Sequence, residues 1–257
     1  MITSERIQSY FREVARRQYE VVSLPPFTLF FHPSDPLPFL NYAIPDGDDG
    51  RALEEPLKAL RAEFKKRERI PRFEFVEAFA PALGRALEAA GFVAEPTAHL
   101  MVADAGTAKP AAPVDGLRID GVTKESHIEE IRRLLFVQRA GFGLPDTALI
   151  SDADATWFQN SLGDGKGFIA WLGEAPVGGG VLMSPIDGLA EVAGVATMEE
   201  FRRRGIGAAI AGAAVRTALD AGVKFVVLSA ADAKAGRVYE SVGFRGYGST
   251  LFYREMP

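Results

Sequence analysis

The chain has 257 residues, 47% of them hydrophobic, so it can bury the core of one large domain or of two small ones. Its formal net charge is −5, and no basic face typical of a nucleic-acid-binding protein is visible. It contains no cysteine, which excludes disulfides, a thiol nucleophile and cysteine-ligated zinc.

The N-terminal segment, the apolar runs and the basic run of the chain argue against membrane and nucleic acid as partners. The N-terminal segment has the pattern of an amphipathic helix with charges throughout, unlike a signal peptide, and no apolar run approaches membrane-spanning length. We therefore expect a soluble, cytoplasmic protein that binds neither membrane nor nucleic acid. The basic run 61–72 contains Glu63 and Glu68, as a solvated helix face does. No metal site is expected, because the three histidines show no ligand spacing: His32, His99 and His127.

The first half of the chain predicts a strand at 39–44, followed by the acidic, glycine-containing segment 45–50. A second strand at 71–77 precedes a helix that ends at Gly91-Phe92. Segment 104–116 is rich in alanine, proline and glycine and is predicted to be a linker.

The second half predicts helices and strands in regular succession. Thr123 can cap a helix that runs to about Arg139, and Ser151 can cap another. A hairpin follows at 167–183, across Gly173–Pro176. The remaining predicted elements are a strand at 189–197, a helix from Ile206 to a stop at Gly222, a strand at 224–230, a helix ending at Gly243, and a strand pair at 245–247 and 249–253.

The turn between the 189–197 strand and the helix after it carries the sequence Arg202-Arg-Arg-Gly-Ile-Gly-Ala208. The N–H groups at a helix start have no partner within the helix, and the positive end of the helix dipole lies there. Gly205 and Gly207 let a ligand approach the backbone closely. The turn therefore predicts a phosphate site. It lacks the Gly-Lys-Ser/Thr of a Walker loop, and Ile210 stands where a Rossmann loop has its third glycine.

A second motif follows at residues 235–244, Ala-Gly-Arg-Val-Tyr-Glu-Ser-Val-Gly-Phe. Together the two motifs resemble the GNAT superfamily of N-acetyltransferases, whose patterns are Gln/Arg-x-x-Gly-x-Gly/Ala and Ala-x-x-Leu-Tyr-x-x-x-Gly-Phe. The resemblance covers residues 116–257. It implies an α/β (α+β) fold with a mixed central sheet flanked by helices, in which two central parallel strands splay apart.

The first half contains a weaker copy of the second motif. A shift of 152 residues aligns Leu87 with Tyr239, and Gly91-Phe92 with Gly243-Phe244. This copy has leucine in place of the tyrosine and acidic residues in place of the phosphate turn, which would repel a pyrophosphate. We therefore expect two tandem GNAT-like domains: a degenerate one without a coenzyme site at 1–103, a linker at 104–115, and an acyltransferase domain at 116–257.

The resemblance implies acetyl-CoA as co-substrate, with no metal. The residues that match its coenzyme site are Val195, Ala196, Thr197, Arg202, Arg203, Arg204, Gly205, Ile206, Gly207 and Ala208. Asp232 stands where the family often has asparagine; since an ionised carboxylate only accepts hydrogen bonds, a contact there would be altered.

The resemblance also implies two catalytic residues. Glu191 precedes Arg202 by the spacing at which histone-acetylating members place a general base, and Tyr239 matches the tyrosine that faces the coenzyme sulfur. Val195 N–H can polarise the thioester carbonyl. Structural alternatives remain open for both side chains: Glu191 on the solvated side of a strand end, and Tyr239 packed under the loop.

The acceptor side of such a domain is built from residues of about 136–165. Acidic and aromatic side chains there would suit a cationic or aromatic amine, although an ordinary helix pair with solvated caps has the same composition. These residues are Phe142, Asp146, Asp152, Asp154, Trp157 and Phe158.

The sequence therefore predicts an N-acetyltransferase (EC 2.3.1.-) that moves an acetyl group from acetyl-CoA to an amine of a small molecule or peptide. Direct attack in a ternary complex is expected, since no cysteine or activated serine can act as a covalent relay. A monomer or homodimer is expected. Two alternatives stay open: a catalytically silent acyl-CoA-binding sensor or partner-binding module, and a site for another nucleotide.

Overall fold

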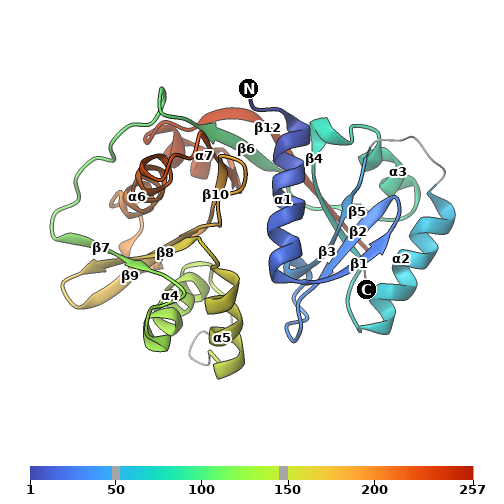
Figure 1. The fold of residues 1–257 in the computed structure, drawn as a ribbon, viewed down its shortest axis with the longest axis horizontal. Helices are drawn as coiled ribbons and strands as arrows, with labels where there is room; N and C mark the ends of the chain where they lie inside the picture. Colours follow the sequence, from blue (N-terminus) through green and yellow to red (C-terminus); the bar gives the residue numbers. More distant parts are fainter. Residues whose placement is uncertain (48–52, 145–149, 257) are drawn as a thin grey trace. The chain divides into compact units, whose positions relative to one another are not determined.

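The computed structural model describes residues 1–47, 53–144 and 150–256. Its contacts divide the chain into two units (Figure 1). The first consists of Met1–Leu100 together with Tyr247–Pro257, and the second is Met101–Gly246. None of the helices in the described ranges is long and apolar enough to cross a membrane.

The first unit is a sheet with helices on it, in the strand order β1-β2-β3-β4-β12, where β12 (Arg245–Arg254) belongs to this unit from Tyr247 on. Its phenylalanine-rich core lies under α2 and α3, while α1 packs against Phe30 and Ile44. Strand β2 is buried along its whole length because both sides of it are covered. The elements of its N-terminal part are α1 (Ser4–Gln18), β1 (Glu20–Leu24), β2 (Phe27–Phe31), β3 (Asn41–Pro45), α2 (Glu54–Lys66), β4 (Arg72–Val76), α3 (Leu83–Ala89) and β5 (Val93–Ala94).

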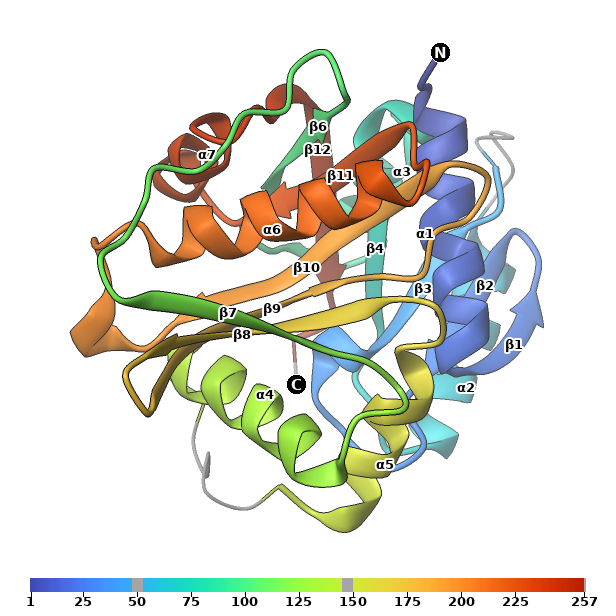
Figure 2. The ribbon, with the colours of Figure 1, turned by 60° about the vertical axis from the view of Figure 1, so that its left-hand side comes forward.

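The second unit is a mixed sheet in the order β6-β11-β10-β9-β8-β7, with helices on both faces. Figure 2 shows α6 on one face and α4 with α5 on the other. Its elements, including those that cross the unit boundaries, are β6 (Ala98–Ala103), β7 (Leu117–Val122), α4 (Ile128–Gly141), α5 (Asp152–Ser161), β8 (Lys166–Leu172), β9 (Ala175–Leu182), β10 (Leu189–Thr197), α6 (Ile206–Asp220), β11 (Phe225–Ala230), α7 (Ala233–Glu240) and β12 (Arg245–Arg254).

Each face of the second sheet has its own apolar core. Alanines and Ile210 of the α6 helix pack on Ala190 and Val192, whereas Leu134 and Val137 of α4 pack on the opposite face. Small side chains let α6 lie close to the strands: a Cβ added at Gly180 would be 2.8 Å from Ile210 Cγ2. The predicted mixed sheet flanked by helices is confirmed.

Most of the predicted helix ends are confirmed. Ser151 Oγ accepts a hydrogen bond from Asp154 N at 3.0 Å and caps α5, and Gly222 ends α6 with φ +81°. The Thr123 prediction is wrong, because Thr123 closes a separate turn with Ser126 and His127 caps α4 by accepting from Glu129 N. The predicted strand pair at 245–253 is also wrong, since β12 is continuous.

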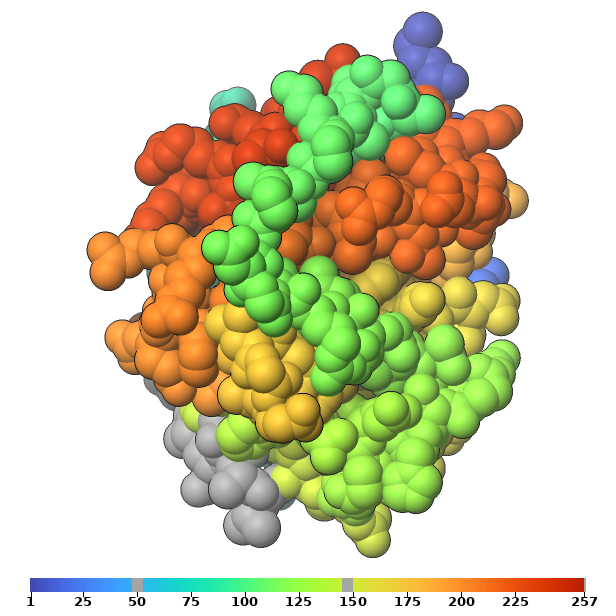
Figure 3. All heavy atoms as spheres, turned by 90° about the vertical axis from the view of Figure 1, so that its left-hand side faces the viewer, coloured from blue at the N-terminus to red at the C-terminus, as the bar shows by residue number. Residues whose placement is uncertain are grey.

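The predicted linker is an ordered strap on the second unit. Lys109 N donates to Val242 O at 3.1 Å, and Ala111 lies against Gly212 of α6. Figure 3 shows the strap crossing the surface formed by α6 and α7. The units therefore divide the chain elsewhere than the predicted boundaries 103 and 116. The strap and the Met101–Ala103 end of β6 belong to the second unit, and the chain from Tyr247 belongs to the first.

The repeat recognised in the sequence coincides with equivalent structure. Strand β4, helix α3, Gly91 and buried Phe92 are matched in the second unit by β11, α7, Gly243 and buried Phe244. Both glycines have positive φ, +90° and +102°. The same shift aligns the first residue of α2, Glu54, with the first residue of α6, Ile206, so the two helices start at equivalent positions. The first turn of α2 is acidic, whereas that of α6 has no acidic residue.

We expect the two equivalent glycines to differ in their tolerance of alanine. At Gly91 a Cβ would meet no atom within 4 Å, so the replacement costs only the left-handed backbone, about 1 kcal/mol. At Gly243 a Cβ would also overlap the carbonyl of Thr107 in the strap, which adds about 2 kcal/mol. Urea unfolding of Gly243→Ala and Gly91→Ala measures the difference. Equal losses would show that the strap does not pack on Gly243.

Candidate active site

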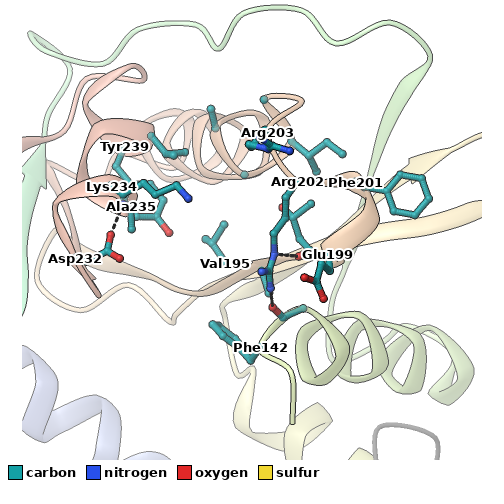
Figure 4. Close-up of a pocket in the computed structure, with 18 residues that line it drawn as sticks. Phe142, Val195, Glu199, Phe201, Arg202, Arg203, Asp232, Lys234, Ala235 and Tyr239 are labelled. Atoms are coloured by element: carbon teal, nitrogen blue, oxygen red, sulfur yellow. Dashed lines mark hydrogen bonds between the residues drawn. The ribbon is translucent and has the colours of Figure 1, made fainter. Parts of the chain in front are cut away.

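A cavity of about 530 Å³ opens in the second unit where the end of β10 meets the starts of α6 and α7. Figure 4 shows residues of α7 on one side of Val195 and the arginines of the turn on the other. The residues that line it are Gly141, Phe142, Val195, Ala196, Thr197, Glu199, Phe201, Arg202, Arg203, Gly205, Ile206, Gly207, Ala208, Asp232, Lys234, Ala235, Val238 and Tyr239.

The start of α6 presents backbone N–H groups to this cavity. Gly205 is the N-cap residue with φ +83°, and no side chain caps the helix. The first turn carries no acidic residue, so Ile206, Gly207 and Ala208 offer their N–H groups at the positive end of the helix dipole. This geometry is suited to a phosphate.

The three arginines of the turn lie differently. The guanidinium of Arg202 donates to Thr197 O at 3.2 Å and to Gly141 O at 2.7 Å, so it joins the end of β10 to the end of α4. Arg203, with φ +64°, lines the cavity. Arg204 lies over the ring of Phe201 and does not line the cavity. Of the three, Arg203 is therefore the best placed to meet a phosphate with its charge.

Strand β10 has an open edge beside the cavity. Its parallel pairing with β11 runs from Leu189 to Glu191, the last pair being Glu191–Val227, although both strands continue. The predicted splay of the two strands is thus present. A bulge between Ala193 and Ala196 follows in the pairing of β10 with β9, and Gly194 within it has φ +60°.

Glu191 lies at the point where the two parallel strands separate. Its neighbours Ala190 and Val192 face the α6 core, so the side chain of Glu191 projects to the α4 face of the sheet. It is partly buried and is not among the residues that line the cavity. The α4 face is where the resemblance places an acceptor, and the role of Glu191 as a base stays a prediction.

Tyr239 lines the cavity from α7. Its ring packs edge-to-face on Phe244, with centroids 6.1 Å apart. Burial raises the pKa of the Tyr239 hydroxyl, so the group stays protonated at neutral pH and can donate a proton. Asp232 is the N-cap residue of the same helix and accepts from Ala235 N at 2.7 Å, a bond that lowers the pKa of its carboxyl group.

The predicted acceptor residues separate into two groups. Phe142 lines the cavity and is 56% exposed, which leaves an apolar ring at its mouth. Phe158 packs in the core between α4 and α5, and neither it nor Trp157 lines the cavity. Asp152 and Asp154, in the first turn of α5, pair with Arg132 and Arg139, and neither aspartate lines the cavity. Asp146, like Asp48 and Asp49 of the first half, lies outside the described residues.

Sequence reasoning missed Glu199, Phe201 and Lys234, which line the cavity, and Gln138 beside it. Lys234, on the first turn of α7, lines the cavity, and only the neighbouring motif could have drawn attention to it. Gln138 of α4 is 9% exposed and donates from Nε2 to Gly194 O at 2.8 Å. No sequence motif marks Gln138, because it lies 56 residues from its partner.

The described residues contain no group of His, Cys, Asp or Glu able to hold a metal ion. The cavity thus combines four features in one place: uncapped helix N–H groups, the cationic side chains of Arg202, Arg203 and Lys234, an open strand edge and a protonated tyrosine.

Comparison with known proteins agrees with this arrangement. Residues 128–244 match the model of the Acetyltransferase (GNAT) family. A solved GCN5-related N-acetyltransferase from Kribbella flavida has a TM-score of 0.81 at 21% identity, covering 100% of this chain and 97% of its own. One from Sphaerobacter thermophilus has a TM-score of 0.65 at 13% identity, covering 90% and 76%.

A tandem GNAT protein from the clavulanic acid biosynthesis pathway has a TM-score of 0.64 at 17% identity, covering 90% of this chain and 79% of its own. At these identities the solved structures show the fold alone. The search of curated proteins gave no match.

Proposed function

We propose that this chain, which contains a GNAT acetyltransferase domain at residues 128–244, moves an acetyl group from acetyl-CoA to an amine of a small molecule or peptide. The observation that carries the proposal is the cavity in which the uncapped start of α6, the open edge of β10 and Tyr239 meet. Transfer is direct, within a ternary complex, since the chain has no cysteine to carry the acetyl group as a thioester.

The coenzyme is held by backbone and charge. The N–H groups of residues 206–208 bind the pyrophosphate, and Arg203 and Lys234 supply positive charge at the cavity wall. The pantetheine amides pair with the open edge of β10 at residues 195–197, as an added strand would.

The groups around the bound pantetheine carry out the acetyl transfer. The amine nitrogen attacks the thioester carbonyl carbon, the C–S bond breaks, and the acetyl group ends as an amide. Glu191 accepts the amine proton, directly or through water, and Tyr239 gives its hydroxyl proton to the departing thiolate. The Val195 N–H stabilises the oxyanion between these steps.

The first half contributes no second coenzyme site. The first turn of α2, equivalent to that of α6, carries Glu54 and Glu55. Carboxylates there complement the helix dipole themselves and repel phosphate. Leu87, in the place of Tyr239, offers no proton. We therefore expect one coenzyme site per chain.

Glu191→Gln tests the proposed base. The amide cannot accept the amine proton, so we expect kcat at neutral pH to fall about a hundredfold. The loss should shrink as the pH rises, because more of the amine is already neutral. Release of free coenzyme A thiol, measured against a panel of cationic and neutral amines from pH 6 to 10, gives both quantities. If Glu191→Gln has the same kcat as the unmodified protein at every pH, Glu191 is not the base.

A silent acyl-CoA-binding sensor is the second candidate, favoured by the absence of Glu191 from the cavity lining. Such a module binds acetyl-CoA but releases no thiol with any amine. Binding with turnover in the same panel therefore separates the two functions.

A further inference from the structure

One peptide unit of β10 is held from outside the strand. Gly194 lies in the bulge with φ +60°, and its carbonyl oxygen accepts from Nε2 of Gln138, a buried side chain on α4. A Cβ at Gly194 would overlap that Nε2 atom, so glycine also permits the close approach. The carbonyl of Gly194 therefore points to the α4 face of the sheet.

The opposite end of the same peptide unit is the N–H of Val195. A trans peptide is planar, with its C=O and N–H directed to opposite sides. Since the Gly194 carbonyl is directed at α4, the Val195 N–H points away from α4, and Val195 lines the cavity while packing against the α6 core. Two other contacts hold the same stretch against α4. Gly141 lies against Ala196, and Arg202 joins Gly141 O to Thr197 O.

We propose that Gln138 is a positioning residue for acetyl transfer. By holding the Gly194 carbonyl it keeps the Val195 N–H directed at the thioester carbonyl oxygen. A hydrogen bond to the carbonyl end of a peptide also polarises its N–H end, which strengthens that donor. Gln138 touches neither substrate; it acts through the 194–195 peptide. The inference rests on the proposed function and adds a residue to it.

The test separates binding from chemistry. Gln138→Met keeps the side-chain volume but removes the Nε2 donor, so the Gly194 carbonyl loses its hydrogen bond from α4. We expect kcat to fall about tenfold to a hundredfold, less than the loss of an oxyanion donor itself. Because coenzyme A lacks the acetyl carbonyl, its Kd should stay within about twofold, while the Kd of acetyl-CoA rises about fivefold, the size of one neutral hydrogen bond.

Gln159→Met is the matched control. Gln159 also donates from a helix of the second unit to backbone carbonyls, but its acceptors, Lys124 O and Ser126 O, lie outside β10. It should leave kcat and both dissociation constants unchanged. If Gln138→Met does not fold, Gln138→Asn takes its place. Its side chain is one methylene shorter, so it stays polar but is too short to donate to Gly194 O, and the same result is expected.

The outcomes are distinct. A selective loss of kcat and of acetyl-CoA affinity supports the inference. Equal weakening of both coenzyme forms, or an unchanged kcat in an active protein, overturns it and leaves the proposed function intact. An unmodified protein that binds no acetyl-CoA, or transfers no acetyl group, overturns the proposed function and this inference together.

Discussion

Replacement of Gly207 by aspartate is expected to weaken acetyl-CoA binding at least about a hundredfold while the protein stays folded. A Cβ at this position meets Thr197 Oγ1 and Val238 Cγ1 at 3.8 Å, which is ordinary contact. A carboxylate in the first turn stabilises a helix through the dipole. The same charge, placed where the pyrophosphate would lie, repels it at short range in a partly enclosed cavity.

Gly207→Asn is the matched control, because it has the same shape without the charge. Calorimetric titration of both variants with acetyl-CoA, alongside their melting temperatures, measures the effect. We expect the Kd of Gly207→Asp to lie far above that of Gly207→Asn, at an equal or higher melting temperature. Similar dissociation constants for the two would mean that the phosphates lie elsewhere.

The second large effect is expected for Tyr239→Phe, which should lower kcat about a thousandfold. Phenylalanine keeps the edge-to-face contact with Phe244 but has no proton for the thiolate. Acetyl-CoA affinity should change less than about threefold, since one hydroxyl is lost from an otherwise intact cavity. Because burial raises the pKa of Tyr239, ionisation of its hydroxyl should not reduce kcat below about pH 10.

Tyr253→Phe serves as its control. Tyr253 is also buried with a raised pKa, but its hydroxyl bonds Glu88 in the first unit. Steady-state rates of thiol release for the two variants give the comparison. A Tyr239→Phe protein as active as Tyr253→Phe would show that the thiolate leaves without a proton from Tyr239.

Local signals in the chain were sufficient for much of the fold and for the part of the cavity formed by the starts of α6 and α7. Glycines at 205, 207, 222 and 243 mark turns and helix ends by themselves, and each lies where the pattern put it. The start of α6 and the tyrosine of α7 were predicted because a short motif carries each. Those elements then meet at one cavity.

Features set by packing between distant residues were not predicted. Composition made 104–115 a linker, yet alanines that suit a flexible segment equally suit close packing on α6. Arg202 matched a phosphate-turn pattern, but its guanidinium donates hydrogen bonds to the carbonyl oxygens of Thr197 and Gly141. Phe158 was grouped with the acceptor residues because it is aromatic, whereas it lies on the face of α5 that packs against the core.

The proposed function requires a single acetyl-CoA site in each chain, at the start of α6. Calorimetric titration of the unmodified protein with acetyl-CoA, repeated with saturating ATP or NAD present, tests it most directly. We expect one acetyl-CoA site per chain and no competition from either nucleotide. No binding, two sites per chain, or displacement by ATP or NAD would contradict it.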